Sequence, residues 1–232
     1  PLGLDDVLMA YGGLRPLVES AGDDTYGASR ASEFMDHEHD GVDGIITAIG
    51  AKYTTARALA AKTVEHIAER LAGSLPPSRT ADAPLDACGV GILDDAIISA
   101  RHAWPDFSEA TIAQLVLFYG TAHEEVLALT REQAELSEVL NADGEILAQA
   151  VFAVRSEGAV RLSDVLLRRT GLGTLGDPGD GTFERVADVL AREARWSDER
   201  RADELAAARD AVCVPTSVSP PLPADASGEA RR

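Results

Sequence analysis

Hydrophobic and polar residues follow two different periods along the chain. Before residue 74, short apolar runs bounded by glycine predict strands at residues 7–11 and 44–49, and the second run is apolar enough for a buried strand. A helical period follows over residues 54–72 and ends at Gly73, a residue type that commonly terminates helices. The residues expected on the core-facing side of this helix are Ala60, Val64, Ile67 and Leu71.

Beyond residue 92 every periodic segment has helical spacing. Helices are expected at residues 93–104, 108–120, 145–157, 163–170, 182–194 and 197–212. The short connections between them predict antiparallel neighbours in a small bundle of about six helices. The expected fold class is therefore α+β, with strands and one helix followed by an all-α bundle.

Proline and glycine divide the chain further. Residues 74–92 contain Pro76, Pro77 and Pro84 and are expected to link residues 1–73 to a helical domain at 93–213. Residues 214–232 carry four prolines and no periodicity, so we expect a disordered tail.

The turn at residues 50–52 is the main candidate for chemistry. Gly50 and Ala51 leave the backbone open to a flat group, and Thr54 or Thr55 can cap the helix that follows. Lys52 adds a positive charge where the helix dipole is also positive, which suits an anion or cofactor. The spacing excludes a nucleotide-triphosphate loop. From the residues alone, a plain strand-to-helix turn whose lysine reaches into water is an equal alternative.

Three other groups of residues could bind an anion or a metal. Arg15 precedes Pro16, which holds it extended and ready to bind an oxyanion, although pairing with a surface carboxylate is the alternative. His37 and His39 would share one side of a strand, as a metal pair requires, but the following Asp-Gly favours a hairpin turn and no metal site. The run 168–170, Arg-Arg-Thr, fits either a ligand clamp or ordinary cations in a last helical turn.

Composition narrows the function classes. Among 232 residues, 21 are Lys or Arg and 39 are Asp or Glu, and the resulting charge of −18 argues against a nucleic-acid partner. No apolar run approaches 18 residues, so no transmembrane helix is expected, and no signal peptide is recognisable. Cys88 and Cys213 match no metal or redox spacing, which suits a reducing cytosol. The start at Pro1 suggests a piece of a longer protein.

Three stretches in order resemble the FAD-dependent glycerol-3-phosphate dehydrogenases and the related α-glycerophosphate oxidases. These are YGGLRPL at 11–17, SR at 29–30 and GAKYTTAR at 50–57. The helical half is similar to the C-terminal domain of that family in four further stretches, at residues 118–120, 153–157, 162–170 and 191–196.

The resemblance implies a flavoprotein that oxidises sn-glycerol 3-phosphate to dihydroxyacetone phosphate and passes electrons through FAD to a membrane quinone. It implies FAD contacts at Gly50, Ala51, Lys52, Tyr53 and Thr54. It also places Arg15, Arg30 and Lys52 around the substrate phosphate. A cytoplasmic location, peripheral attachment to the inner face of the plasma membrane and a homo-oligomer are compatible with it.

The departures from the family pattern define what we expect of this chain alone. Ala51 and Ala56 replace the glycine and the aromatic residue usual in the lysine motif, and no Gly-x-Gly-x-x-Gly follows a strand anywhere. No catalytic residue is assigned, because none of the five histidines falls within the three motifs. We therefore expect this chain to be the C-terminal part of the enzyme and to be catalytically inactive by itself. An oxygen-using oxidase and a non-catalytic helical assembly module are the alternatives.

Overall fold

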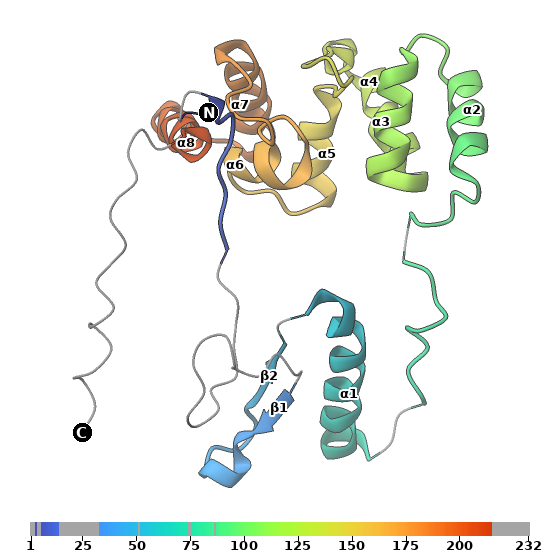
Figure 1. Cartoon of the computed structure of the whole chain (residues 1–232), viewed down its shortest axis with the longest axis vertical. Helices are drawn as coiled ribbons and strands as arrows, with labels where there is room; N and C mark the ends of the chain where they lie inside the picture. The colour runs from blue at the N-terminus through green and yellow to red at the C-terminus, as the bar shows by residue number, and fades with distance from the viewer. Residues whose placement is uncertain are drawn as a thin grey trace. The chain divides into compact units, whose positions relative to one another are not determined.

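The computed structural model describes residues 3, 6–13, 33–50, 52–73, 76–85 and 87–214. It divides into two compact units, Gly12–Cys88 and a second unit formed by Pro1–Tyr11 with Gly89–Arg232. We call the first the hairpin unit and the second the helical unit (Figure 1). The boundaries 1–73, 74–92 and 93–213 stay a prediction. Arg15, Arg30, Ala51 and the segment 215–232 lie outside the described residues.

The hairpin unit begins with two antiparallel strands, β1 (Glu33–Asp36) and β2 (Ile46–Ile49), paired from Glu33 opposite Ile49 to Asp36 opposite Ile46. The turn between them is a 3₁₀ helix, η2 (His37–Asp40), closed by Gly41 at φ 80°. The hairpin predicted from Asp-Gly is therefore confirmed. The side chains of β2 are half-buried or exposed, so the prediction of a buried strand was wrong. Residues 7–11 form neither helix nor strand, which corrects the other predicted strand.

Helix α1 (Tyr53–Ala72) follows β2, and its stop at Gly73, with φ 81°, confirms the predicted end. The N-cap residue is Lys52 and not Thr54 or Thr55. The predicted core-facing side was wrong in part, because Val64 and Leu71 are 56% and 82% exposed. The more covered positions are Thr55, Leu59, Ala61, Thr63, His66, Ile67 and Ala68. An alanine-rich helix has little contrast between its sides, so its sequence does not fix the side that packs.

The helical unit contains α2 (Leu93–Ala103), α3 (Glu109–Tyr119), η3 (Gly120–Ala122), α4 (His123–Glu132), η4 (Ala134–Ser137), α5 (Ala148–Ser156), α6 (Leu162–Asp164), a π-helix η5 (Val165–Arg169), α7 (Asp180–Ala194) and α8 (Asp198–Val212). Ser108 and Ser197 cap α3 and α8 by accepting backbone N–H groups from Thr111 and Arg200. The predicted all-helical character of this part is thus confirmed, and the antiparallel arrangement of its helices stays a prediction. The predicted helix start at Glu145 was wrong, since α5 begins at Ala148.

One continuous core holds the helical unit together. Its largest fully buried side chains come from several helices and include Ile112, Leu115, Leu166, Phe183 and Leu190. Figure 1 shows α3, α5 and α7 succeeding one another across this unit. No helix among the described residues combines the length and the apolar character that crossing a membrane requires.

Candidate functional site

The candidate site is the turn that connects β2 to α1. Ile49 ends the strand and Tyr53 begins the helix, so Gly50 and Lys52 lie in the short connection between the two. Lys52 is extended, with φ −122° and ψ 123°, and its carbonyl accepts hydrogen bonds from the Thr55 backbone N–H at 3.2 Å and the Thr55 hydroxyl at 3.1 Å. Lys52 is therefore tied to the first turn of α1 by the backbone and the side chain of Thr55.

The start of α1 is electropositive. Among the described residues no side chain caps this helix, and its first turn contains no acidic residue. The ends of the peptide dipoles and the first N–H groups consequently favour a negative group there. Lys52 adds a full charge, and no carboxylate of the described residues pairs with it. The turn can thus receive an anionic group without displacing an internal ion pair.

An open groove of about 440 Å³ runs from this turn along α1. Lys52 is the only charged residue among the described ones that line it. The other lining residues are Ala48, Gly50, Ala56, Leu59, Ala60, Thr63 and Val64. A mostly apolar groove with one cation at its end suits a flat organic group that has one electronegative edge.

A charge network fastens the hairpin to α1. Asp36 accepts a hydrogen bond from His66 Nε2 at 2.9 Å and forms an ion pair with Arg70. Arg70 also contacts Glu38 at 3.0 Å and Asp43 at 2.9 Å. Hydrogen bonds from His66 and the Glu38 backbone N–H, with the Arg70 charge, hold the pKa of Asp36 well below its usual range. The network thus fixes the end of β1 and the hairpin turn to α1, and β1 pairs with β2, the strand that leads to the β2–α1 turn.

The structure brings Gly50, Lys52, Tyr53 and Thr54 together at the turn, as their order along the chain requires. Tyr53 is fully exposed. The groove along α1 was missed by the sequence analysis. The sequence signal for the groove is a row of small or apolar residues four positions apart, Ala56, Ala60 and Val64. The sequence analysis places Ala60 and Val64 on the core-facing side of the helix instead.

His37 of the histidine pair and both arginines of the arginine pair contact side chains within the chain. His37 contacts Asp40 at 2.8 Å and the Thr47 hydroxyl at 2.9 Å, inside the hairpin turn. No group of three metal-ligating side chains occurs among the described residues. Arg168 and Arg169 lie 3.1 and 3.7 Å from Asp164 and Glu157. These contacts favour a structural role over the ligand clamp.

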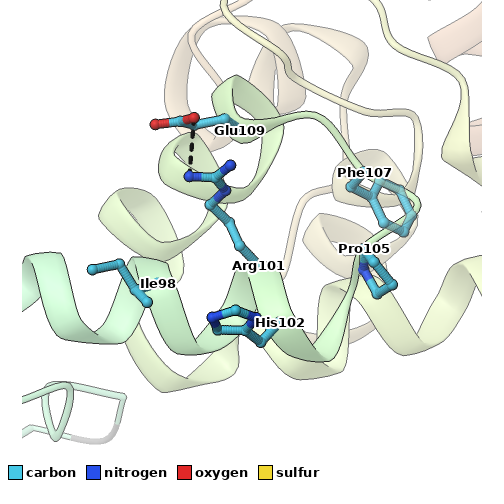
Figure 2. A pocket seen from close by; sticks show the side chains of 6 residues that line it. All are labelled: Ile98, Arg101, His102, Pro105, Phe107 and Glu109. Atoms are coloured by element: carbon cyan, nitrogen blue, oxygen red, sulfur yellow. Dashed lines mark ion pairs between the residues drawn. The ribbon is translucent and has the colours of Figure 1, made fainter.

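A second hollow, of about 330 Å³, lies between α2 and the start of α3. Figure 2 shows Arg101 reaching across it to Glu109, with which it forms an ion pair at 3.0 Å. Its other lining residues are Ile98, His102, Pro105 and Phe107. Since Arg101 is already paired and both charged side chains are about half exposed or more, this hollow is a weaker candidate than the β2–α1 turn.

Comparison with known proteins identifies relatives of this chain. The family model described as the C-terminal domain of alpha-glycerophosphate oxidase matches residues 46–201, a range that includes the turn, α1 and most of the helical unit. A glycerol-3-phosphate dehydrogenase of Synechocystis is 31% identical over 198 residues, or 84% of this chain and 35% of the relative. One from Mycobacterium leprae is 32% identical over 86% of this chain and 34% of its own length.

The aerobic glycerol-3-phosphate dehydrogenase of Escherichia coli is 26% identical over 89% of this chain and 39% of its own length. The chain thus spans about a third of the length of the relatives it matches. The matched stretch contains the β2–α1 turn, α1 and the helices from α2 to α7. The chain therefore belongs to the family of the glycerol-3-phosphate dehydrogenases and α-glycerophosphate oxidases, to whose C-terminal portion it corresponds.

Proposed function

We propose that this chain is the C-terminal part of an FAD-dependent glycerol-3-phosphate dehydrogenase. In this proposal the β2–α1 turn forms one wall of the flavin site, and the whole enzyme oxidises glycerol 3-phosphate to dihydroxyacetone phosphate. Electrons then pass to a quinone, with oxygen as the alternative acceptor. A quinone acceptor would bring the cytoplasmic enzyme to the membrane surface.

The observation that carries the proposal is the apolar groove that ends at Lys52 and the positive end of α1. The flavin ring is flat and largely apolar, and its pyrimidine edge is electronegative, so the groove and the turn fit it. Gly50, Ala51, Lys52, Tyr53 and Thr54 would hold that edge. FAD supplies the two-electron acceptor of the oxidation, and a fixed positive charge beside it raises its reduction potential.

We further propose that Arg15, Arg30 and Lys52 bind the phosphate of the substrate. At an effective dielectric constant near 20, a cation about 4 Å from a phosphate charge contributes roughly 4 kcal/mol before desolvation. Lys52 would thus join the substrate phosphate to the flavin edge and orient the substrate. The base that takes the hydroxyl proton is not assigned to any residue of this chain.

This chain spans about a third of the length of these relatives. We propose that activity needs the part of those proteins that this chain does not span, where the pyrophosphate of FAD would bind. The 232-residue chain alone is then expected to be colourless and inactive.

The test is flavin content and glycerol-3-phosphate-dependent dye reduction by the longer protein that contains this chain. Lys52→Ala is expected to raise KM about 10- to 100-fold or to lose flavin, because a charged hydrogen bond contributes about 1.5–3 kcal/mol. The matched control is Lys62→Ala, since Lys62 is the only other lysine, is exposed on the same helix and does not line the groove. Arg15→Ala tests the phosphate site, with a raised KM and retained flavin as the expected result.

The alternative is that the helical unit is an assembly module and the turn records ancestry only. The buried core of the helical unit favours it as a self-contained module. A longer protein that binds no flavin, or a Lys52→Ala variant that behaves like Lys62→Ala, would support this alternative and contradict the flavoprotein proposal.

A further inference from the structure

The loop between η5 and α7, residues 170–179, is anchored in the core of the helical unit. Leu172 is only 7% exposed and belongs to that core. The Gly171 backbone N–H donates to the buried carboxyl of Glu145 at 2.5 Å, and the Gly173 N–H donates to a carbonyl of the π-helix at 2.9 Å. The start of this η5–α7 loop is therefore fixed to two parts of the unit, the turn before α5 and the π-helix.

Close packing carries this order further along the loop. A Cβ at Gly173 would lie 2.8 Å from Leu167 Cδ2, so the loop backbone lies directly on the π-helix. The Thr174 hydroxyl and N–H both donate to the Gly171 carbonyl, at 2.7 and 3.0 Å. The Gly176 N–H donates to the Gly173 carbonyl at 3.4 Å. A series of short-range bonds thus leads from the anchored start of the loop to Gly176.

Gly176 meets the N-terminal segment of the chain. It is buried although Leu175 and Asp177 on either side of it are exposed. Its φ is 101°, and a Cβ there would collide with the carbonyl oxygen of Leu8 and lie 3.3 Å from the carbonyl carbon. Residues 6–11 belong to the helical unit, and Figure 1 shows them in dark blue beside it. Only a residue without a side chain lets the two backbones approach so closely.

The segment that Gly176 contacts has no regular structure of its own. Residues 7–11 form neither helix nor strand, so neither kind of backbone pairing sets their position. The side chain of Leu8 is 69% exposed, and that of Met9 is half-buried. The contact with the loop is therefore made by the Leu8 backbone and does not need burial of its side chain.

The same segment leads to the proposed phosphate site. Arg15 follows Leu8 by seven residues. Seven residues span at most about 25 Å when fully extended, so whatever holds Leu8 limits the positions that Arg15 can reach. A misplacement of about 1 Å in a positioned group can cost up to about 10²-fold in rate, so the placement of this arginine matters for the reaction.

We propose that the helical unit positions the substrate-binding arginine of the enzyme, and that Gly176 is the positioning residue. The anchored η5–α7 loop holds the backbone of Leu8, and the chain carries this position on to Arg15. The inference rests on the proposed function, because it takes Arg15 as a ligand of the substrate phosphate. It gives the helical unit a part in substrate binding in which no side chain of the loop needs to contact the substrate.

The test is the steady-state kinetics of Gly176→Ala in the longer protein that contains this chain. The added Cβ must displace the Leu8 backbone, so the KM for glycerol 3-phosphate is expected to rise about 10-fold while flavin content is retained. Gly179→Ala is the matched control. Gly179 lies in the same loop with a similar φ of 89°, but it has open space around it, so the substitution adds the same backbone strain without the contact. Its KM is expected to equal that of the parent.

A double-mutant cycle separates positioning from a general loss of stability. If Gly176 acts through Arg15, Gly176→Ala adds little to the KM of Arg15→Ala, because the positioned group is already absent. A purely structural loss would instead lower flavin content and kcat or multiply the KM equally in both backgrounds, and either result would overturn the proposal. If Gly176→Ala does not fold, Thr174→Val, which removes the hydroxyl bond that shapes the loop, takes its place in the cycle.

The contact itself is tested without reference to activity. The 232-residue chain contains two methionines, Met9 beside Leu8 and Met35 in β1, so ¹³C-methyl labelling gives one signal for the segment and one internal reference. Gly176→Ala is expected to shift the Met9 signal and leave the Met35 signal unchanged, and Gly179→Ala to leave both unchanged. Equal effects of the two glycine variants on Met9 would overturn the proposal.

Failure of this inference is distinguishable from failure of the proposed function. The inference alone fails if the longer protein binds flavin and Arg15→Ala raises the KM, but Gly176→Ala behaves like Gly179→Ala. A longer protein without flavin, or an Arg15→Ala variant with the KM of the parent, contradicts the proposed function and removes the positioning of Arg15 with it. The Met9 signal would then still report whether the loop holds the segment.

Discussion

The hairpin unit and the helical unit are stabilised by opposite means. In the helical unit, side chains from α3, α5, η5 and α7 are removed from water almost completely and form one apolar core. In the hairpin unit, Ala68 is the only buried apolar residue among the described ones, and Arg70 with its three carboxylates joins hairpin to helix. Apolar side chains such as Tyr53, Val64 and Leu71 stay exposed there.

This difference has a functional consequence. A closed core leaves no room for a ligand, whereas a small unit with open apolar surfaces can present a groove and a helix end to one. A two-stranded hairpin is also marginal by itself, so the hairpin unit depends on α1 and on the charges that bind it. The candidate site therefore lies in the unit whose described residues bury the least apolar surface.

The largest expected effect on stability is that of truncating a buried leucine in the helical unit, and an exposed leucine in the hairpin unit is its comparison. Leu166→Ala is expected to lower the free energy of unfolding by about 2–5 kcal/mol, because Leu166 is fully buried. Leu71→Ala is expected to change it by no more than about 0.5 kcal/mol, since Leu71 is largely exposed. Urea unfolding followed by the fluorescence of Trp104 and Trp196, both in the helical unit, measures the first, and amide exchange in α1 the second. Equal effects would contradict the contrast between the units.

A glycine pair tests how tightly the helical unit is packed. Gly144→Ala is expected to cost about 2–4 kcal/mol, from positive φ and from a Cβ that would meet the α3 backbone. Gly158 has a similar φ of 72° but open space around it, so Gly158→Ala is expected to cost only about 1–2 kcal/mol. Denaturant unfolding of both variants isolates the cost of close packing, and identical losses would mean that the contact at Gly144 is soft.

In the hairpin unit the corresponding test is the removal of one charge, that of Asp36. The lowered pKa of Asp36 means that its carboxylate stabilises the folded unit above pH 3.8, and that this stability is lost as the pH falls further. Asp36→Asn is expected to loosen β1 at neutral pH and to abolish the acid dependence. Amide exchange in β1 and α1 between pH 2.5 and 6 measures both. An unchanged acid dependence in the variant would assign it to another group.

Much of this architecture could be predicted from local signals. Asp40-Gly41 specified the hairpin, Gly73 the end of α1, and Ser108 and Ser197 the starts of α3 and α8, because each signal acts within a few residues. The turn at Gly50 and Lys52 was located for the same reason.

The features that the sequence did not predict depend on contacts between residues that are far apart in the chain. Glu145 stands in an apolar stretch that resembles a helix start, and only its contacts with α3 and Gly171 show why it lies in a turn. The π-helix at Val165–Arg169 has no sequence period of its own, and the packing of Thr170 on Val165 closes it. The groove beside α1 depends on which side of an alanine-rich helix meets the hairpin.

The smallest effect expected is from a charge network that lies on a complete core. Arg155 contacts Glu193 at 2.7 Å and Glu132 at 3.2 Å, so it joins α5 to α7 and α4, as Arg70 joins α1 to the hairpin. Its side chain is 40% exposed, so water screens these pairs and the expected coupling of Arg155 to Glu193 is about 0.3–1 kcal/mol.

A double-mutant cycle of Arg155→Ala and Glu193→Ala, by urea unfolding, measures this coupling. It should shrink further in 1 M salt, where the screening length falls to about 3 Å. A coupling above about 2 kcal/mol that resists salt would exceed the range for exposed pairs and would mean that charge also organises the helical unit. The expected small value would instead leave Arg70 and Asp36 as the charges on which a unit depends, because among the described residues of the hairpin unit only Ala68 is buried beneath them.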